Sequence, residues 1–146
     1  MDRDDMVENN IDPSESISDH ELIQELKTAT EDLLWFSESE YPLRIFYWRK
    51  SDFSIQALLQ RYNYPPQTKV VVKDWQSFFA SAIREEDWYD EIEIAETRRY
   101  QNLVNLMAQN MKNIRVYLVG EIEIDVYILG ETESAIAGLT TKIIAT

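Results

Sequence analysis

The sequence predicts a single-domain α/β fold, with one mixed or largely antiparallel sheet and helices packed on its faces. Two short segments rich in β-branched and aromatic residues, 43–48 and 68–73, favour strands in the first half of the chain. Apolar residues at helical spacing around these segments favour amphipathic helices. From Val116 onward apolar and polar residues alternate, as is typical of antiparallel strands. A chain of 146 residues can bury roughly two thirds of its unfolded surface, which is enough for a real core.

Residues 1–17 and 18–146 differ in character. The first segment is acidic and has no apolar periodicity, so we expect a disordered N-terminal arm. Ser18 and Glu21 then form the S-x-x-E pattern that is typical of a helix start. An apolar stripe follows at helical spacing, made of Leu22, Leu26, Ala29 and Leu33. This first helix is predicted to end before Ser37, and residues 18–146 are predicted to form the domain.

The middle of the chain predicts three more helices around the two early strands. A short helix is expected at 55–62, because Asn63 and two prolines follow it. Asp74 is a candidate cap for a helix over 75–83. A long amphipathic helix is predicted from 92 to about 112. Its stripe consists of Ile92, Ala95, Arg99, Leu103, Leu106 and Met107.

The last third of the chain predicts three strands. Residues 116–119 and 122–128 are expected to form two strands that turn near Gly120. We expect a loop over 130–138, which begins and ends with glycine, and a final strand over 139–145.

Charge is unevenly distributed along the chain. The formal net charge is -13, and 13 of the 27 acidic residues lie in residues 1–41, against two basic ones. Seven more acidic residues lie in 85–96, whereas 42–84 carries seven basic and two acidic residues. Such a chain repels nucleic acid and anionic membranes and attracts a basic protein, so we expect neither of the first two as a partner. The alternative is that the acidity serves solubility alone.

Several kinds of chemistry are excluded or disfavoured. The chain has no cysteine and one histidine, His20, which lies in a predicted first helical turn and is expected to be a solvated surface residue. No glycine-rich phosphate loop or nucleophile elbow occurs. We therefore expect no cofactor and no enzyme activity of these kinds, which leaves only carboxylate catalysis open. The first residues do not resemble a signal peptide and no apolar run is long enough to span a membrane, so we expect a cytoplasmic protein.

Two acidic motifs are candidates for function. In extended chain Glu38 and Glu40 would point the same way, roughly 7 Å apart, a spacing that suits either a hydrolase pair or an exposed acidic turn. The second motif, residues 85–91, places Trp88 and Tyr89 among five acids. These two aromatic residues either fold inward or serve as an interface anchor.

Beyond these patterns, the sequence resembles the inhibitors of sugar-nonspecific nuclease, the nuclease A inhibitor-like proteins. The resemblance is carried by L-L-W-F-S-E-S-E-Y-P at 33–42, D-W-Y at 87–89, V-Y at 116–117, G-E at 120–121, D-V-Y at 125–127, G-E-T at 130–132, A-G at 137–138 and the threonine-rich C-terminal segment up to Thr146. It covers nearly everything from about residue 22 to 146. Residues 49–67 and the arm do not match the family pattern.

The resemblance implies a small acidic α/β/α sandwich that blocks the active site of a DNA/RNA endonuclease of the ββα-metal type, which uses a catalytic magnesium ion. It implies that Glu38 is the central acidic contact, with Ser37, Ser39 and Glu40 beside it in the turn. Trp88, between Asp87 and Tyr89, matches the family's aromatic contact. Thr146 matches the residue that approaches the partner's metal.

From this resemblance we expect competitive occlusion by a monomer that forms a heterodimer with its nuclease. Glu38 would pair with active-site cations, Trp88 would fill an apolar pocket at the rim, and Thr146 would approach the magnesium ion. The main alternative is an acidic protein-protein interaction or adaptor domain that has this fold and no nuclease target. A carboxylate hydrolase is the third possibility.

Overall fold

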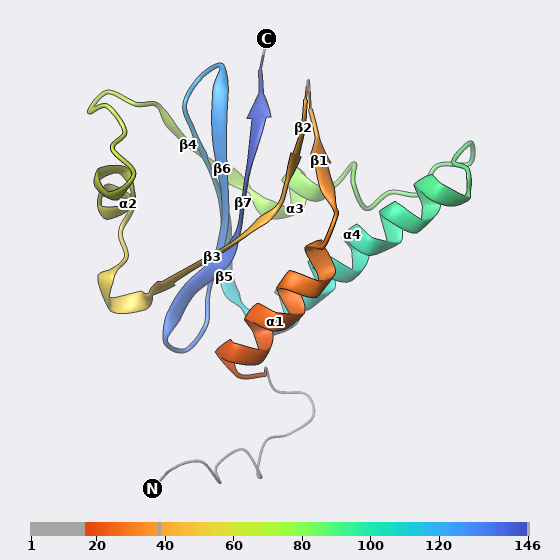
Figure 1. Ribbon diagram of the computed structural model, residues 1–146, viewed down its shortest axis with the longest axis horizontal. Helices are drawn as coiled ribbons and strands as arrows, with labels where there is room; N and C mark the ends of the chain where they lie inside the picture. Colours follow the sequence, from red (N-terminus) through yellow and green to blue (C-terminus); the bar gives the residue numbers. More distant parts are fainter. Residues whose placement is uncertain (1–16, 38, 146) are drawn as a thin grey trace, which may run out of the picture.

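The computed structural model describes residues 17–37 and 39–145, and its centre is a five-stranded antiparallel sheet (Figure 1). The strands lie in the order β3-β7-β6-β5-β4. Their bounds are β3 (Arg44–Arg49), β4 (Val70–Asp74), β5 (Lys112–Val119), β6 (Glu123–Glu131) and β7 (Ala135–Ile144). A separate hairpin consists of β1 (Leu34–Phe36) and β2 (Glu40–Pro42). The prediction of a largely antiparallel sheet is therefore confirmed.

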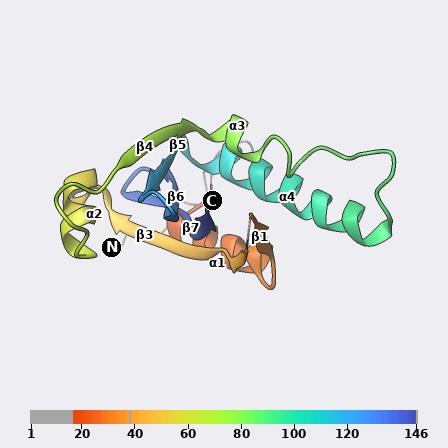
Figure 2. The same ribbon diagram turned by 90° about the horizontal axis from the view of Figure 1, so that it is seen from above.

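Helices cover both faces of the sheet (Figure 2). One face carries α1 (Asp19–Thr30), α3 (Trp75–Phe79) and α4 (Glu91–Asn110). The other face carries α2 (Ile55–Arg61), which follows the 3₁₀ turn η2 (Lys50–Asp52). The domain is thus the α/β/α sandwich that the family resemblance implies.

Alternation along β6 divides the core into two layers. Val126 and Ile128 face the larger cluster, which includes residues of α1, α3 and α4. Tyr127 and Leu129 face the smaller cluster, around Leu58 of α2. Successive side chains of a strand point to opposite faces, so the central strand of the sheet supplies both layers. This is the pattern that distinguishes a sandwich from a sheet with one solvated face.

The predicted helix starts are confirmed. The Ser18 hydroxyl accepts from the Glu21 amide at 3.2 Å, and Asp74 Oδ2 accepts from the Ser77 amide at 2.9 Å. Each cap satisfies an amide that the first helical turn leaves without a partner. In the usual S-x-x-E capping box the glutamate side chain accepts from the backbone amide of the serine. Here the Glu21 side chain accepts from the Ser18 hydroxyl instead.

The predicted loop over 130–138 is wrong. β6 continues to Glu131 and β7 begins at Ala135, so the connection has three residues, 132–134. The glycine at 138 is needed within the strand, because its φ is +154° and a Cβ there would lie 1.9 Å from the Ile128 carbonyl oxygen. Close approach of two backbones, and not a loop, explains this glycine.

Three other sequence predictions need correction. The helix expected over 75–83 ends at Phe79. The first helix ends at Thr30 and not just before Ser37, because Leu34–Phe36 forms β1. Ile92 was placed on the core stripe of α4, but its side chain is 79% exposed, because the first turns of α4 project beyond the sheet (Figure 1).

At the N-terminal end, the Ile17 amide donates to Asn110 Oδ1 at 3.0 Å. The rest of the predicted arm, 1–16, lies outside the described residues. Within the described part of the chain, no helix has the length and apolar character that crossing a membrane requires.

Burial of Tyr100 predicts a loss of stability at high pH. Its hydroxyl donates to the Leu34 carbonyl oxygen, and burial raises its pKa above the ordinary value of 10.0. The unfolded chain then releases this proton first, so stability falls as pH rises above about 10. Tyr100→Phe is expected to make the free energy of unfolding depend less steeply on pH, which urea titrations between about pH 8 and 11 would measure. An unchanged pH slope in the variant would contradict this assignment.

Candidate functional site

The β1-β2 hairpin is anchored in the core by Trp35. Its ring stacks on Phe78 with centroids 4.6 Å apart, and it meets Phe79 and Tyr100 edge to face at 5.5 Å. Aromatic pairs in these geometries add about 0.5–1.5 kcal/mol each beyond the area they bury. The hairpin is therefore held rigidly against α3 and α4, although each of its strands has only three residues.

Strand β7 holds the hairpin from the other side. The Thr141 hydroxyl donates to the Pro42 carbonyl oxygen at 2.9 Å. This contact joins β2 to the central sheet, where Thr141 itself pairs with Val126 of β6. The β1-β2 hairpin is thus hydrogen-bonded to β7 as well as packed on α3 and α4.

The hairpin tip lies beside the end of β7. The Ser37 amide donates to the Ser39 carbonyl oxygen at 2.9 Å, which closes the turn. The Ile144 amide donates to the Ser37 hydroxyl at 3.2 Å. Glu38 and Thr146 lie outside the described residues. Their described neighbours, however, meet on one side of the molecule and not on opposite sides.

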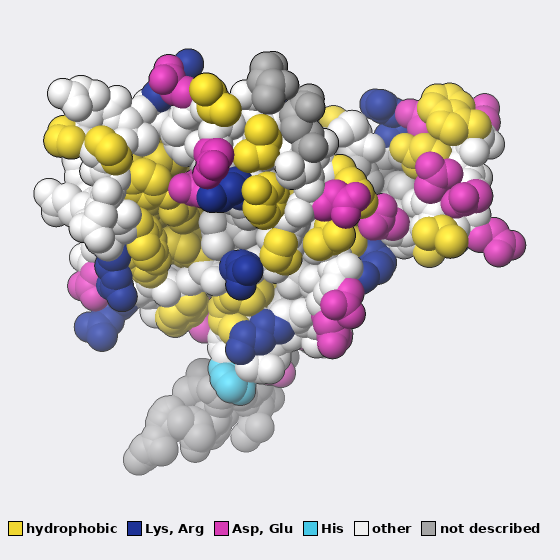
Figure 3. Space-filling model, turned by 45° about the horizontal axis from the view of Figure 1, so that its top comes forward, with side chains coloured by type: hydrophobic (Ala, Val, Ile, Leu, Met, Phe, Trp, Pro, Cys, Tyr) yellow, Lys and Arg dark blue, Asp and Glu magenta, His cyan; other side chains and the backbone are white. Residues whose placement is uncertain are grey.

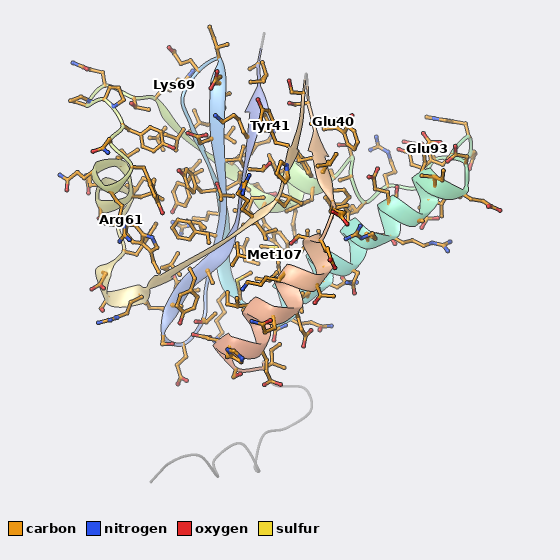
Figure 4. All side chains as sticks on the ribbon, viewed as in Figure 1. Glu40, Tyr41, Arg61, Lys69, Glu93 and Met107 are labelled. Atoms are coloured by element: carbon orange, nitrogen blue, oxygen red, sulfur yellow. The ribbon has the colours of Figure 1, made fainter. Side chains whose placement is uncertain are left out.

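Charged side chains lie on the same side of the molecule as this tip. Glu40 is exposed on the hairpin, and Figure 4 shows it near Tyr41 on the same side of the molecule as Glu93 of α4. The nearby cation, Lys142, lies 3.2 Å from Glu123 and 3.8 Å from Asp125. The hydrogen bond to Glu123 and the charge of Asp125 raise the Lys142 pKa. The ammonium therefore remains charged and offsets part of the local negative charge.

A second candidate surface is the projecting start of α4. Asp90 and Glu93 form a reciprocal capping box, with hydrogen bonds of 2.8 and 2.9 Å. The preceding loop is tied to α4 because the Gln101 side chain donates to the Ile83 carbonyl oxygen at 2.8 Å. On this fixed loop Trp88 is 75% exposed. Figure 3 shows hydrophobic side chains at this end of the molecule, surrounded by acidic ones.

A groove of about 320 Å³ joins the two surfaces. Trp35 and Phe36 of β1 line one side, and Tyr89, Glu93 and Glu96 line the other. The floor includes Tyr100, whose hydroxyl bonds to β1. The groove therefore lies between β1, which leads into the hairpin tip, and the start of α4, two segments that are remote in sequence.

The structure accordingly groups the predicted site residues in two places. Ser37, Ser39 and Glu40 lie at the hairpin tip, whereas Asp87, Trp88 and Tyr89 lie at the start of α4. The sequence leaves open whether Trp88 and Tyr89 fold inward or are exposed as an interface anchor. In the structure Trp88 points outward, whereas Tyr89 is half-buried.

Sequence reasoning missed two members of this surface, Phe36 and Ile92. Phe36 is 52% exposed, and Ile92 is the most exposed large apolar residue reported for the described chain. The sequence signal for Ile92 is its position directly after the acidic motif 85–91. Large exposed apolar side chains beside a polar rim are typical of protein-binding surfaces.

Residues 17–37 and 39–145 contain no group of three His, Asp or Glu side chains that could hold a metal ion. The surface is instead acidic, aromatic and rigid.

Comparison with known proteins identifies a family for this chain. The model of one protein family, described as nuclease A inhibitor-like protein, matches residues 20–146. None of the curated proteins compared with the chain matches it. The family match includes the hairpin, α4 and the whole sheet, and it begins within α1. The chain therefore belongs to the nuclease A inhibitor-like protein family.

Proposed function

We propose that this protein inhibits a sugar-nonspecific DNA/RNA endonuclease by covering its active site in a complex of one inhibitor with one nuclease. The surface that binds would consist of the hairpin tip, the end of β7 and the start of α4. One observation carries the proposal: the hydrogen bond between Ser37 and Ile144 brings the neighbours of Glu38 and Thr146 together. A single catalytic cleft can then engage both.

The proposed chemistry is substrate mimicry by anions. A nuclease cleft binds phosphate through cationic side chains and a magnesium ion that prefers oxygen ligands. Glu38 would pair with the cations, flanked by Ser37, Ser39 and Glu40, and Thr146 would approach the metal. Because the hairpin is anchored by Trp35 before binding, little conformational entropy would be lost.

The start of α4 would provide apolar contact at the rim of the cleft. Trp88 is exposed on a loop that ion pairs and a capping box hold in place. Asp87 and Tyr89 flank it, and Ile92 lies one helical turn further on. Exposed aromatic anchors of this kind dominate the affinity of many interfaces.

The net charge of -13 supports rapid encounter with a basic cleft. The function is tested by titrating the purified protein into a magnesium-dependent nonspecific nuclease from the same organism and following plasmid digestion. We expect stoichiometric inhibition whose association rate falls as salt rises from about 0.01 to 0.15 M. Digestion that continues at full rate with excess protein would contradict the proposal and favour an adaptor role.

Trp88→Ala separates binding from folding. The side chain is 75% exposed, so its removal is expected to change the free energy of unfolding by less than about 0.5 kcal/mol. Inhibition should weaken at least about tenfold, because an interface anchor is lost. The matched control is Val72→Ala on β4, an exposed apolar residue on a different edge of the molecule. Equal inhibition by both variants would remove Trp88 from the proposed interface.

A further inference from the structure

A large groove lies away from the proposed nuclease site, between β3 and α2. It has a volume of about 980 Å³. Aromatic rings line it, namely Phe46 and Trp48 of β3, Tyr62 after α2, and Tyr127 of β6. Figure 3 shows hydrophobic side chains gathered on this side of the molecule, with Lys and Arg side chains beside them. The part of its lining from Arg49 to Tyr62 lies in the segment 49–67, whereas Tyr127 belongs to one of the motifs that carry the family resemblance.

Basic side chains make this groove different from the rest of the surface. Arg49 and Arg61 line it, against one acidic residue, Asp52. The Arg61 guanidinium lies over the Trp48 ring, 5.1 Å from its centroid, and forms no ion pair with any other described residue. Arg49 meets Asp52 only at 3.8 Å, with both side chains mostly exposed. A molecule of net charge -13 thus carries a basic aromatic groove.

The N-terminal segment joins the domain at α1, beside the edge strand β3. Asp19, in the first turn of α1, accepts from the Tyr47 hydroxyl at 3.4 Å. The Ser134 hydroxyl fixes the same Asp19 carboxylate at 2.7 Å. Successive side chains of β3 alternate between the two faces, so Tyr47 points to the α1 face, whereas Phe46 and Trp48 point into the groove. Residues 1–16 therefore start on the opposite face of the sheet and would pass over β3 to reach the groove.

Residues 1–16 match the groove in charge and in apolar content. They contain six acidic residues, Asp2, Asp4, Asp5, Glu8, Asp12 and Glu15, against one basic residue, Arg3. The apolar side chains Met6, Val7 and Ile11 are spaced among these acids. Sixteen residues in extended conformation reach up to about 50 Å, which is enough to pass over the edge strand β3 from α1 to the groove.

We propose that residues 1–16 bind in the groove between β3 and α2 of the same molecule. Their carboxylates pair with Arg49 and Arg61, and Met6, Val7 and Ile11 pack on the aromatic rings. Tethering favours this occupant, since a short linker gives an effective concentration on the order of millimolar. The segment would also cover β3, which is an edge strand of the sheet and would otherwise be open to pairing with another chain. The proposal does not depend on nuclease binding.

Paramagnetic broadening in the full chain tests the proposal. The chain has no cysteine, so Asn10→Cys provides a single attachment point for a nitroxide label. At about 0.01 M salt we expect selective broadening of the amides of Tyr47, Arg61 and Tyr62, and its loss at about 1 M salt, where the Debye length falls to ~3 Å. Broadening that is uniform, absent or confined to α1 would overturn the proposal.

Two controls sharpen this test. Arg61→Glu should abolish the selective broadening, whereas Arg98→Glu, the same change on an exposed arginine of α4, should leave it in place. A mixture of labelled protein with unlabelled, isotope-enriched protein detects binding between molecules. Broadening of the groove amides in that mixture, at the strength seen within one molecule, would overturn the proposal in favour of a second copy as the occupant.

Discussion

Replacing Glu38 by alanine is expected to raise the inhibition constant at least about 30-fold, which corresponds to about 2 kcal/mol. The proposed reason is that the cations of the nuclease cleft lose their partner and remain buried without compensation. Such a loss exceeds what a charge at the rim of an interface contributes. The inhibition constant follows from plasmid digestion at fixed nuclease concentration and increasing inhibitor concentration.

A pair of charge-matched variants separates this local effect from the overall charge. Glu38→Gln and Glu25→Gln each remove one negative charge, but Glu25 lies exposed on α1, away from the hairpin. We expect Glu38→Gln to weaken inhibition strongly and Glu25→Gln to leave it within about twofold, because exposed charges act mainly on the association rate. Equal inhibition constants for the two variants would contradict a specific role for Glu38.

Gly138→Ala is expected to destabilise the fold by about 3 kcal/mol or more. The new Cβ would lie 1.9 Å from the Ile128 carbonyl oxygen, so β6 and β7 would have to separate at the centre of the sheet. The φ of +154° adds strain, since side chains rarely adopt it. Thermal unfolding should show a fall in Tm of roughly 6–12 °C.

The control for this substitution is Thr140→Ala, two residues further along β7 on a partly exposed position. It should cost less than about 1 kcal/mol, because it neither closes a backbone contact nor changes φ. If Gly138→Ala and Thr140→Ala have similar Tm values, the close approach of β6 and β7 at this glycine is wrong.

Local sequence signals predicted much of this fold. Ser18 and Asp74 cap helices as expected, because a cap depends only on residues three positions away. Alternation from Val116 onward predicted antiparallel strands, because side-chain direction in a strand follows directly from sequence position. Where neighbours along the chain determine the structure, the sequence was sufficient.

Predictions failed where contacts distant in sequence determine the structure. Strands of three residues at β1 and β2 carry too little periodicity to detect, and their hairpin depends on Trp35 packing against Phe78. Gly138 looked like part of a loop because only the partner strand shows why it is glycine. Ile92 fits a helical stripe, but no element extends far enough to cover it.

The sequence indicated which segments form the candidate site, but not that they lie close together in the fold. Resemblance to the family indicated segments 37–40 and 87–89. The hydrogen bond between Ser37 and Ile144, and the groove from Phe36 to Glu93, arise only from the tertiary fold. These contacts are what make a single binding surface physically reasonable.

Amide hydrogen exchange, measured on the free protein and on its complex with the nuclease, shows which segments one cleft engages. We expect binding to slow exchange at 36–40, 87–93 and 143–145 together, while the α2 face, including Leu58, keeps its rates. Slowed exchange confined to the α2 face, or to only one of the three segments, would contradict the proposal that one cleft engages them all.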